Sequence, residues 1–450
     1  MKDRTEFLGK EPVGRLLTKL SIPAMTGMLV MASYNVVDTI FVGRGVGPLG
    51  LGAIASAFPI QFIVHALAMM VGVGAASLVS RSLGAGDSER AEVALGNAFF
   101  MALVAGLFVS AAGRLSMPTL VALTGAPSEL APLIRDYLGA IFLGSSLLVC
   151  GMTMNCVIRS EGSAKVAMMS LILSAVTNIA LDPIFIFVLK MGVTGAAVAT
   201  VIAQGVTFLW AVAHYLVPGR SSVRLHISNL RPRWSILKEI MTVGGSEFAR
   251  LSAQSVAGVL ILNRLSFYGG TDAMAAQGIV QKMLSLSIMP IFGIAQGLQP
   301  IVGYAYGAGD NMRAKKAVEL ALISASIISL GTSALLLTVP GPLVRVFTDS
   351  PALIDTTKSF IRVAISMYFV VGFQIIGTAT FQSLGFSRPS MVLSLSRQVL
   401  LLIPLALILP PYLGLLGVFL VYPTADIASA SLTMWLLARY RKRLIPSQVN

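Results

Sequence analysis

"LVSRSLGAGDSERAEVA" (78–94) and "IVGYAYGAGDNMRAKKA" (301–317) are two versions of one sequence, and they decide the fold. Eight of the 17 aligned positions are identical, at an offset of 223 residues. The same offset relates "RSEG" (159–162) to "QSLG" (382–385). A repeat in register over such a distance indicates that the chain consists of two structural units built alike.

The GAGD box in each copy predicts a tight turn between two helices. A glycine at the end of a helix adopts the left-handed conformation easily, and an aspartate can cap the helix that follows. Gly86 and Asp87 hold these positions in the first copy, and Gly309 and Asp310 hold them in the second. This pattern favours a structural role over a direct contact with substrate.

The composition predicts a protein that crosses a membrane many times. Of the 450 residues, 56% are hydrophobic and 12% are charged, whereas about 25% are charged in soluble domains. Apolar stretches of about 20 residues recur along the whole chain, and each can span a hydrocarbon core of roughly 30 Å. The first 20 residues are too charged for a secretory signal, so we expect the chain to insert through its own first span.

We expect an all-α polytopic membrane protein with twelve transmembrane helices. Glycine, proline and charged residues separate the apolar stretches. The expected spans are 16–42, 51–82, 92–113, 130–158, 165–189, 193–217, 235–264, 275–306, 315–340, 356–384, 388–411 and 416–440.

The distribution of basic residues predicts the orientation. About 22 of the 33 Lys and Arg residues fall in the segments on the N-terminal side of the membrane, and about 8 fall on the opposite side. This bias places both termini in the cytoplasm of a plasma membrane. The net charge of +14 then reflects contact with anionic lipid of the bilayer, so no nucleic acid partner is needed.

Six spans per repeat let both halves enter the membrane in the same direction. We therefore expect two six-helix bundles related by a pseudo-two-fold axis along the membrane normal. The N-terminal lobe would comprise residues 1–217 and the C-terminal lobe residues 235–450. Residues 218–234, the longest polar stretch, would form a cytoplasmic linker between them.

Duplicated bundles around a cleft are typical of secondary transporters that work by alternating access. The chain contains no GxxxxGK[ST], HExxH or GxSxG motif and no paired Cys/His cluster. An enzyme, an ATP-driven pump or a protein with a bound cofactor is therefore not indicated.

Two carboxylates lie in the outer half of the N-terminal lobe. Asp38 is in the first span and Asp182 is in the fifth. Asn178 shares a helix face with Asp182, and Thr200 of the sixth span lies at a similar depth. Acids inside a membrane are costly and mark ion pathways, so we predict a cation-coupling site that contains these four residues.

This set of oxygen donors suits either of two cations. Close carboxylates in a low dielectric can hold a proton, and the same oxygens can hold a dehydrated Na⁺. Pro183 cannot donate an amide hydrogen, so a bend there would free backbone carbonyls as further donors. Alternatively, Asp38 bonds a neighbouring tyrosine or asparagine and only fixes the packing.

Four further charged residues in the spans are secondary candidates. Glu247 and Arg250 are three residues apart on the seventh span and can pair there. Arg397 and Asp426 lie on the last two spans and can pair across helices. Bracing of the C-terminal lobe is the favoured interpretation of both pairs.

Several motifs, in order, carry a resemblance to a known family. They are "YNVVDTIFVGR", "LGAGD" with its echo "YGAGD", "RSEG", "NIALDPIFIF", "GVTGAAVAT" and "SRQVLLLIPLALILP". The chain resembles the MATE (multidrug and toxic compound extrusion) transporters over nearly all of its length, and most closely the MepA-like members.

The resemblance implies a V-shaped cavity between two six-helix lobes and export of amphipathic or cationic compounds, driven by H⁺ or Na⁺. It also implies that Asp38, Asn178, Asp182 and Thr200 match the cation site of the DinF-like branch. The NorM-like branch has an acid in the seventh span at a position that falls on Gln254 here. The tenth span has no acid, so coupling through the N-terminal lobe is favoured.

Two other functions stay open at this point. A flippase for lipid-linked precursors would use a related fold, but it would line its cavity with several basic residues to bind pyrophosphate. A membrane scaffold or receptor that transports nothing would not need matched buried carboxylates. The family resemblance suggests that a monomer is sufficient.

Overall fold

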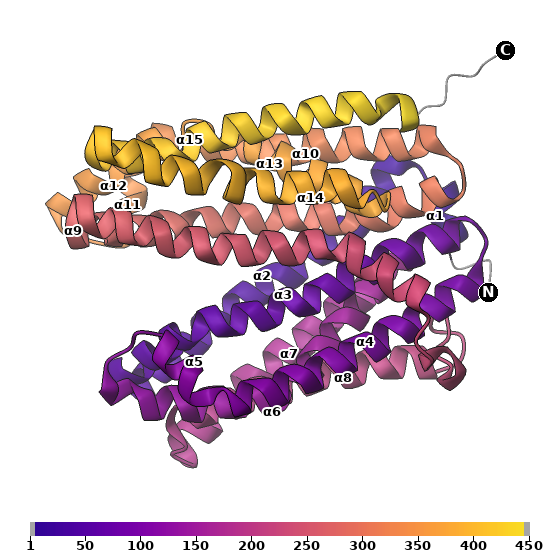
Figure 1. Ribbon diagram of the computed structural model, residues 1–450, viewed down its shortest axis with the longest axis horizontal. Coiled ribbons are helices and arrows are strands. Elements are labelled where there is room, and N and C mark those ends of the chain that lie inside the picture. The colour runs from indigo at the N-terminus through magenta and orange to yellow at the C-terminus, as the bar shows by residue number, and fades with distance from the viewer. Residues whose placement is uncertain (1–4, 445–450) are drawn as a thin grey trace.

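The computed structural model describes residues 5–444, and every regular element in that range is a helix. The long helices run side by side along one direction and form two groups (Figure 1). Helices α2 to α8 form the first group, the N-terminal lobe. Helices α9 to α15 form the second, the C-terminal lobe.

The helices follow the apolar stretches of the sequence to within a few residues at most ends. Their bounds are α1 Glu6–Lys10, α2 Val13–Gly45, α3 Pro48–Gly84, α4 Ser88–Leu115, α5 Met117–Leu123, α6 Ala131–Ser160, α7 Ala164–Pro183, α8 Gly192–Leu216, α9 Trp234–Gly307, α10 Asn311–Thr338, α11 Pro340–Arg345, α12 Pro351–Ala364, α13 Val371–Ser383, α14 Ser387–Leu395 and α15 Ile403–Leu444. Short 3₁₀ segments are η2 Ser128–Leu130, η4 Ile227–Leu230 and η5 Tyr368–Val370, and π-helical segments are η3 Ile184–Val188 and η6 Ser396–Leu402.

Within the described residues, nine helical runs are long and apolar enough to cross a membrane, or ten if one bent pair counts as a span. Two of these runs break in the middle, because Gly270 (φ 62°) and Gly414 (φ 59°) have non-helical backbone. Only glycine adopts this region without strain. Counting each broken run as two gives the expected twelve spans.

The tenth span differs from the prediction of one continuous helix over 356–384. Helix α12 ends at Ala364, and the chain continues from Tyr368 at an angle of 52°. Hydropathy reports only that a segment is apolar, so it does not detect a change of backbone direction within that segment. The span is therefore two half-helices.

Each lobe has its own apolar core. The core of the N-terminal lobe includes Ile134, Leu138 and Ile158, and that of the C-terminal lobe includes Phe360 and Ile361, all at most 1% exposed. A third cluster joins the first turns of α2 to α9 and α10 at the end of the molecule that carries α1. At that end, the two lobes share one core.

The two GAGD boxes form the same turn, as the repeat predicts. Gly86 and Gly309 have φ of 74° and 75°. Asp87 accepts a hydrogen bond from the Arg90 amide, and Asp310 accepts one from the Arg313 amide, each at 2.9 Å. Each aspartate thereby caps the next helix.

The lobes contact one another closely at the end that holds these turns, which we call the closed end. Four glycines there leave no room for a Cβ atom, because a backbone carbonyl of the other lobe faces each of them. Gly74 faces the Ile240 carbonyl, Gly84 faces Tyr304, Gly244 faces Met70 and Gly307 faces Arg81. The backbones of α3 and α9 are therefore in direct contact.

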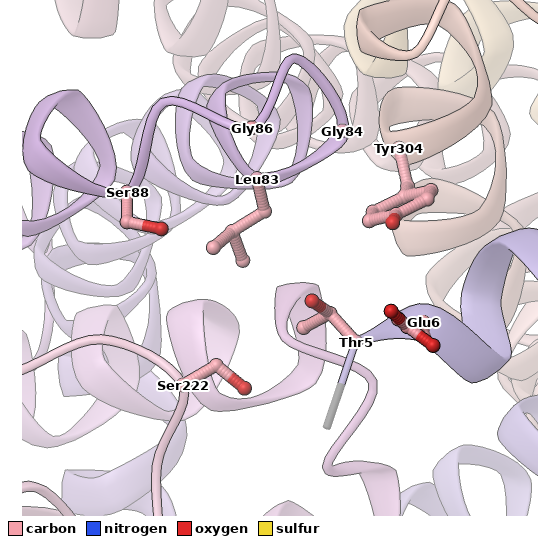
Figure 2. A pocket seen from close by; sticks show the side chains of 8 residues that line it. All are labelled: Thr5, Glu6, Leu83, Gly84, Gly86, Ser88, Ser222 and Tyr304. Atoms are coloured by element: carbon pink, nitrogen blue, oxygen red, sulfur yellow. The ribbon is translucent and has the colours of Figure 1, made fainter. Parts of the chain in front are cut away.

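Polar contacts also join the lobes at the closed end. Ser77 Oγ donates to the Gln382 carbonyl at 2.5 Å. Glu239 bonds Arg81 at 2.9 Å and Arg90 at 2.8 Å. Figure 2 shows a small polar hollow beside these contacts, lined by Thr5, Glu6, Leu83, Gly84, Gly86, Ser88, Ser222 and Tyr304.

The glutamate of "RSEG" holds the segment between the lobes in place. Glu161 Oε2 accepts hydrogen bonds from Ser221 Oγ at 2.5 Å and from the Ser222 amide at 2.9 Å. Glu161 is 2% exposed, and this burial raises the pKa of its carboxyl to about 7. The carboxyl therefore anchors the linker to the turn between α6 and α7.

Candidate cation site

Asp182 is fully buried in the N-terminal lobe and has no donor among the described residues. It lies near the end of α7, 18 residues beyond Ala164, so about 27 Å from the closed end. Both of its carboxylate oxygens lack a hydrogen-bond partner. A buried charged group without a partner costs several kcal/mol, so this pair of oxygens requires an occupant.

Asn178 and Thr200 lie beside Asp182, as their spacing predicts. Asn178 Nδ2 donates to Thr200 Oγ1 at 3.4 Å, which leaves Asn178 Oδ1 as a buried acceptor without a donor. Gln204, one turn along α8 from Thr200, presents a further such acceptor, Oε1. We did not predict Gln204, although its spacing of four residues from Thr200 is a signal for it.

Asp38 of α2 completes the group. Its carboxyl lies close enough to that of Asp182 to share a hydrogen bond when one of the two carries a proton. Asp38 is partly exposed, whereas Asp182 is not, so ions can reach the pair from the Asp38 side. Asp38 Oδ1 has no donor among the described residues, so the tyrosine and asparagine beside it do not satisfy that oxygen.

Two tyrosines stand within electrostatic range of the carboxylates. Tyr34 is on α2, one turn from Asp38, and Tyr137 is on α6. The Tyr137 hydroxyl accepts a hydrogen bond from Gln61 Nε2 of α3 at 3.0 Å. Neither Tyr137 nor Gln61 was predicted, because only the packing of α3 and α6 against α2 brings them to the site.

An apolar cluster closes the site toward the end of the lobe far from the closed end. Val42, Ile186 and Ala196 are buried against one another. Each lies one helical turn beyond a site residue, four positions from Asp38, Asp182 and Thr200 respectively. The cluster separates the oxygen atoms from the outer surface of the lobe.

Pro183 does not end α7 abruptly. The helix includes Pro183 and continues into the π-helical turn Ile184–Val188. A π turn widens the helix and often occurs beside a functional site. Here it brings Ile186 into the apolar cluster, so the irregular backbone lies directly outside the carboxylates.

The secondary candidates form the two predicted ion pairs. Arg250 bonds Glu247 at 2.5 Å, and Gln382 donates to the same carboxylate at 3.3 Å. Arg397 bonds Asp426 at 2.6 Å. Each charge is matched within the C-terminal lobe, so neither pair has unsatisfied oxygens like those of Asp182.

The C-terminal lobe has no counterpart of the carboxylate pair at the position that we compared by resemblance. Gln254 accepts a hydrogen bond from Arg250 at 3.4 Å. Among the described residues, no three His, Cys, Asp or Glu side chains are close enough together to hold a metal ion. The donor set around Asp182 consists of carboxylate, amide and hydroxyl oxygens, which suit a proton or an alkali cation.

A family model for MatE matches residues 23–184 and 248–408, one segment in each lobe. The chain belongs to the MatE family. It is accordingly a multi-pass membrane transporter and not an enzyme. The doubled match corresponds to the repeat read from the two GAGD boxes.

Curated relatives cover almost the whole chain. The FAD transporter of Shewanella oneidensis is 28% identical over 436 residues, which are 95% of this chain and 94% of that protein. The multidrug export protein MepA of Staphylococcus aureus is 26% identical over 445 residues, 99% of this chain and 98% of the relative.

Solved structures show the same fold. A MOP superfamily transporter from Pyrococcus furiosus, described as having a binding pocket of reverse polarity, is 29% identical with a TM-score of 0.90. An outward-facing multidrug resistance MATE transporter is 28% identical with a TM-score of 0.91. Each alignment covers 97% of this chain and 98% of the other.

Proposed function

We propose that this transporter is a multidrug antiporter that exports amphipathic or cationic compounds in exchange for H⁺ or Na⁺. Its similarity to the MepA export protein supports export of such compounds. The coupling cation would bind at Asp38, Asn178, Asp182 and Thr200 in the N-terminal lobe.

The unsatisfied oxygens around Asp182 carry this proposal. Asp182 is 0% exposed, and both of its oxygens lack donors, as do Asn178 Oδ1 and Asp38 Oδ1. A scaffold protein would gain nothing from this costly arrangement. A cation that enters and leaves these oxygens supplies the missing partner, and its movement can be coupled to a change of conformation.

Coupling requires that the cation bind the two conformations of the transporter with different affinities. Here the closed end is sealed, while Asp38 remains partly exposed. Cation binding would favour this state, in which substrate leaves outward. Substrate binding from the opposite side would favour release of the cation.

The closed end would face the cytoplasm of the inner membrane. Arg81, Arg90 and Arg313 lie at or beside this end, in agreement with an excess of basic residues on the cytoplasmic side. Both termini would then be cytoplasmic. The lobes would be residues 1–217 and 235–450, joined by the linker 218–234, and one monomer in the bilayer would complete the transport cycle without a cofactor.

Efflux of the cationic dye ethidium from proteoliposomes tests the function. A Na⁺ gradient and a pH gradient are imposed separately on vesicles with wild-type protein. Acceleration by one of the two gradients identifies the coupling ion. Efflux that responds to neither gradient contradicts antiport and favours the flippase function instead.

A further inference from the structure

Lys282 lies in the part of α9 that follows the break at Gly270. It is 12 residues beyond the break, which places it about 18 Å along the helix and near the middle of a hydrocarbon core of roughly 30 Å. Its side chain is exposed on the protein surface. A lysine at this depth is costly if it faces lipid, so it must face another environment.

Lys282 differs from the other two basic residues that the sequence places inside spans. Arg250 is paired with Glu247 at 2.5 Å, and Arg397 is paired with Asp426 at 2.6 Å. Among the described residues, the Lys282 ammonium has neither an ion pair nor a hydrogen bond. Its backbone carbonyl accepts from Ser285 Oγ at 2.7 Å.

The helix geometry shows which way Lys282 points. Farther along α9, Gly293 packs against Met25 of α2, and Gln296 Nε2 lies 3.5 Å from Met28 Sδ of α2. At about 100° per residue, Lys282 lies within about 40° of both contact residues around the helix axis. It therefore points toward the N-terminal lobe and away from lipid.

Lys282 and Asp38 lie at a similar depth. Lys282 is 11 residues from Gly293, or about 16 Å along α9, and Asp38 is 13 residues from Met25, or about 20 Å along α2. The two helices run in opposite directions from their contact (Figure 1). The space between the lobes at this depth thus has acids on one wall and a free ammonium on the other.

We propose that Lys282 binds an anionic group, a phosphate or a carboxylate, on the transported compound. This inference rests on the proposed function and narrows its substrate class. A lysine presents three N–H donors and a positive charge, which suit such a group. The acids of the opposite wall would be occupied by the coupling cation, so they would not repel the anion.

Flavin mononucleotide and riboflavin form a matched pair of fluorescent probes, because they differ by one phosphate. Binding of each probe to purified protein in neutral detergent is measured by fluorescence quenching. The variants are Lys282→Gln, Lys282→Arg and Lys190→Gln. The last removes one positive charge from an exposed position at the start of α8 and serves as the control.

Wild type should bind flavin mononucleotide more tightly than riboflavin. Lys282→Gln should weaken binding of flavin mononucleotide about 10- to 100-fold, since a charge-assisted hydrogen bond is lost. Riboflavin binding should stay within about twofold of wild type. Lys282→Arg should restore much of the preference, and Lys190→Gln should behave as wild type.

Two outcomes would overturn the inference. One is wild-type protein that shows no preference for the phosphorylated probe, including protein that binds neither. The other is Lys282→Gln that weakens both probes alike. Gradient-driven efflux of ethidium separates this test from that of the proposed function, because Lys282→Gln should retain it. Loss of gradient coupling in wild type with intact phosphate preference would contradict antiport alone.

Discussion

Gly244 offers the sharpest test of how the closed end is sealed. A Cβ atom at this position would overlap the carbonyl oxygen of Met70 on α3. The neighbouring Gly245 meets only the terminal methyl of Met391, at 3.6 Å, which is an ordinary contact. Gly244→Ala should therefore separate α3 from α9, whereas Gly245→Ala should not.

The magnitude follows from the cost of inserting an atom into a packed contact, about 1–3 kcal/mol. If this cost applies only when the end is closed, it shifts the balance between closed and open states about 5- to 150-fold toward open. The gain in helix propensity from Gly to Ala, up to about 1 kcal/mol, applies to both conformations and to both variants. The control therefore removes it.

Distances between spin labels measure this shift. Ser88 and Met312 are exposed and lie at the start of α4 and of α10, beside the GAGD turns of the two lobes. Labels at these positions, in a background without Cys150 and Cys156, should show more of the long-distance population in Gly244→Ala. An unchanged distance distribution in Gly244→Ala, with wild-type-like Gly245→Ala, would refute the reasoning.

Three further predictions concern the stability of the fold. Asp87→Ala and Asp310→Ala each remove a helix cap, so each should lower the free energy of unfolding by about 1 kcal/mol, and thermal denaturation of the double variant should show additive losses unless the caps are not independent. Burial raises the pKa of Glu161 from its ordinary value of 4.5 to about 7, so the folded state binds more protons and stability should fall as pH rises from about 4.5 to 7, by at most about 3 kcal/mol; melting curves of Glu161→Gln should lack this slope, and an equal slope would show that another group causes it. Asp426→Asn leaves Arg397 buried without its partner and should destabilise the protein by about 3–5 kcal/mol, while Arg397→Gln combined with Asp426→Asn should recover part of the loss in the same melting assay; a double variant less stable than Asp426→Asn would contradict this.

Much of the fold is encoded in local patterns that a sequence shows directly. The apolar stretches locate the twelve spans, and the GAGD boxes predict both caps, because a cap depends on residues three positions apart. The Glu247–Arg250 pair follows from helix spacing in the same way. The bend between α12 and α13 does not, because no single residue type in that apolar segment specifies a change of direction.

The candidate site divides along the same line. Asn178, Asp182 and Thr200 could be predicted together, because two of them share a helix face and the third lies at a matching depth. Tyr137 and Gln61 reach the site only through the packing of α3, α6 and α2. The direction of Lys282 likewise depends on the contact of Gly293 with Met25, which sequence spacing alone does not give.

Substrate movement by Asp182→Asn tests the central claim most directly. The variant keeps the size and polarity of the side chain but removes its charge. Two measurements are compared in proteoliposomes: accumulation of ethidium driven by the coupling gradient, and exchange of labelled for unlabelled ethidium without a gradient. The account predicts that Asp182→Asn loses gradient-driven accumulation while exchange persists. Accumulation by Asp182→Asn at the wild-type rate would show that the cation does not act through this carboxylate.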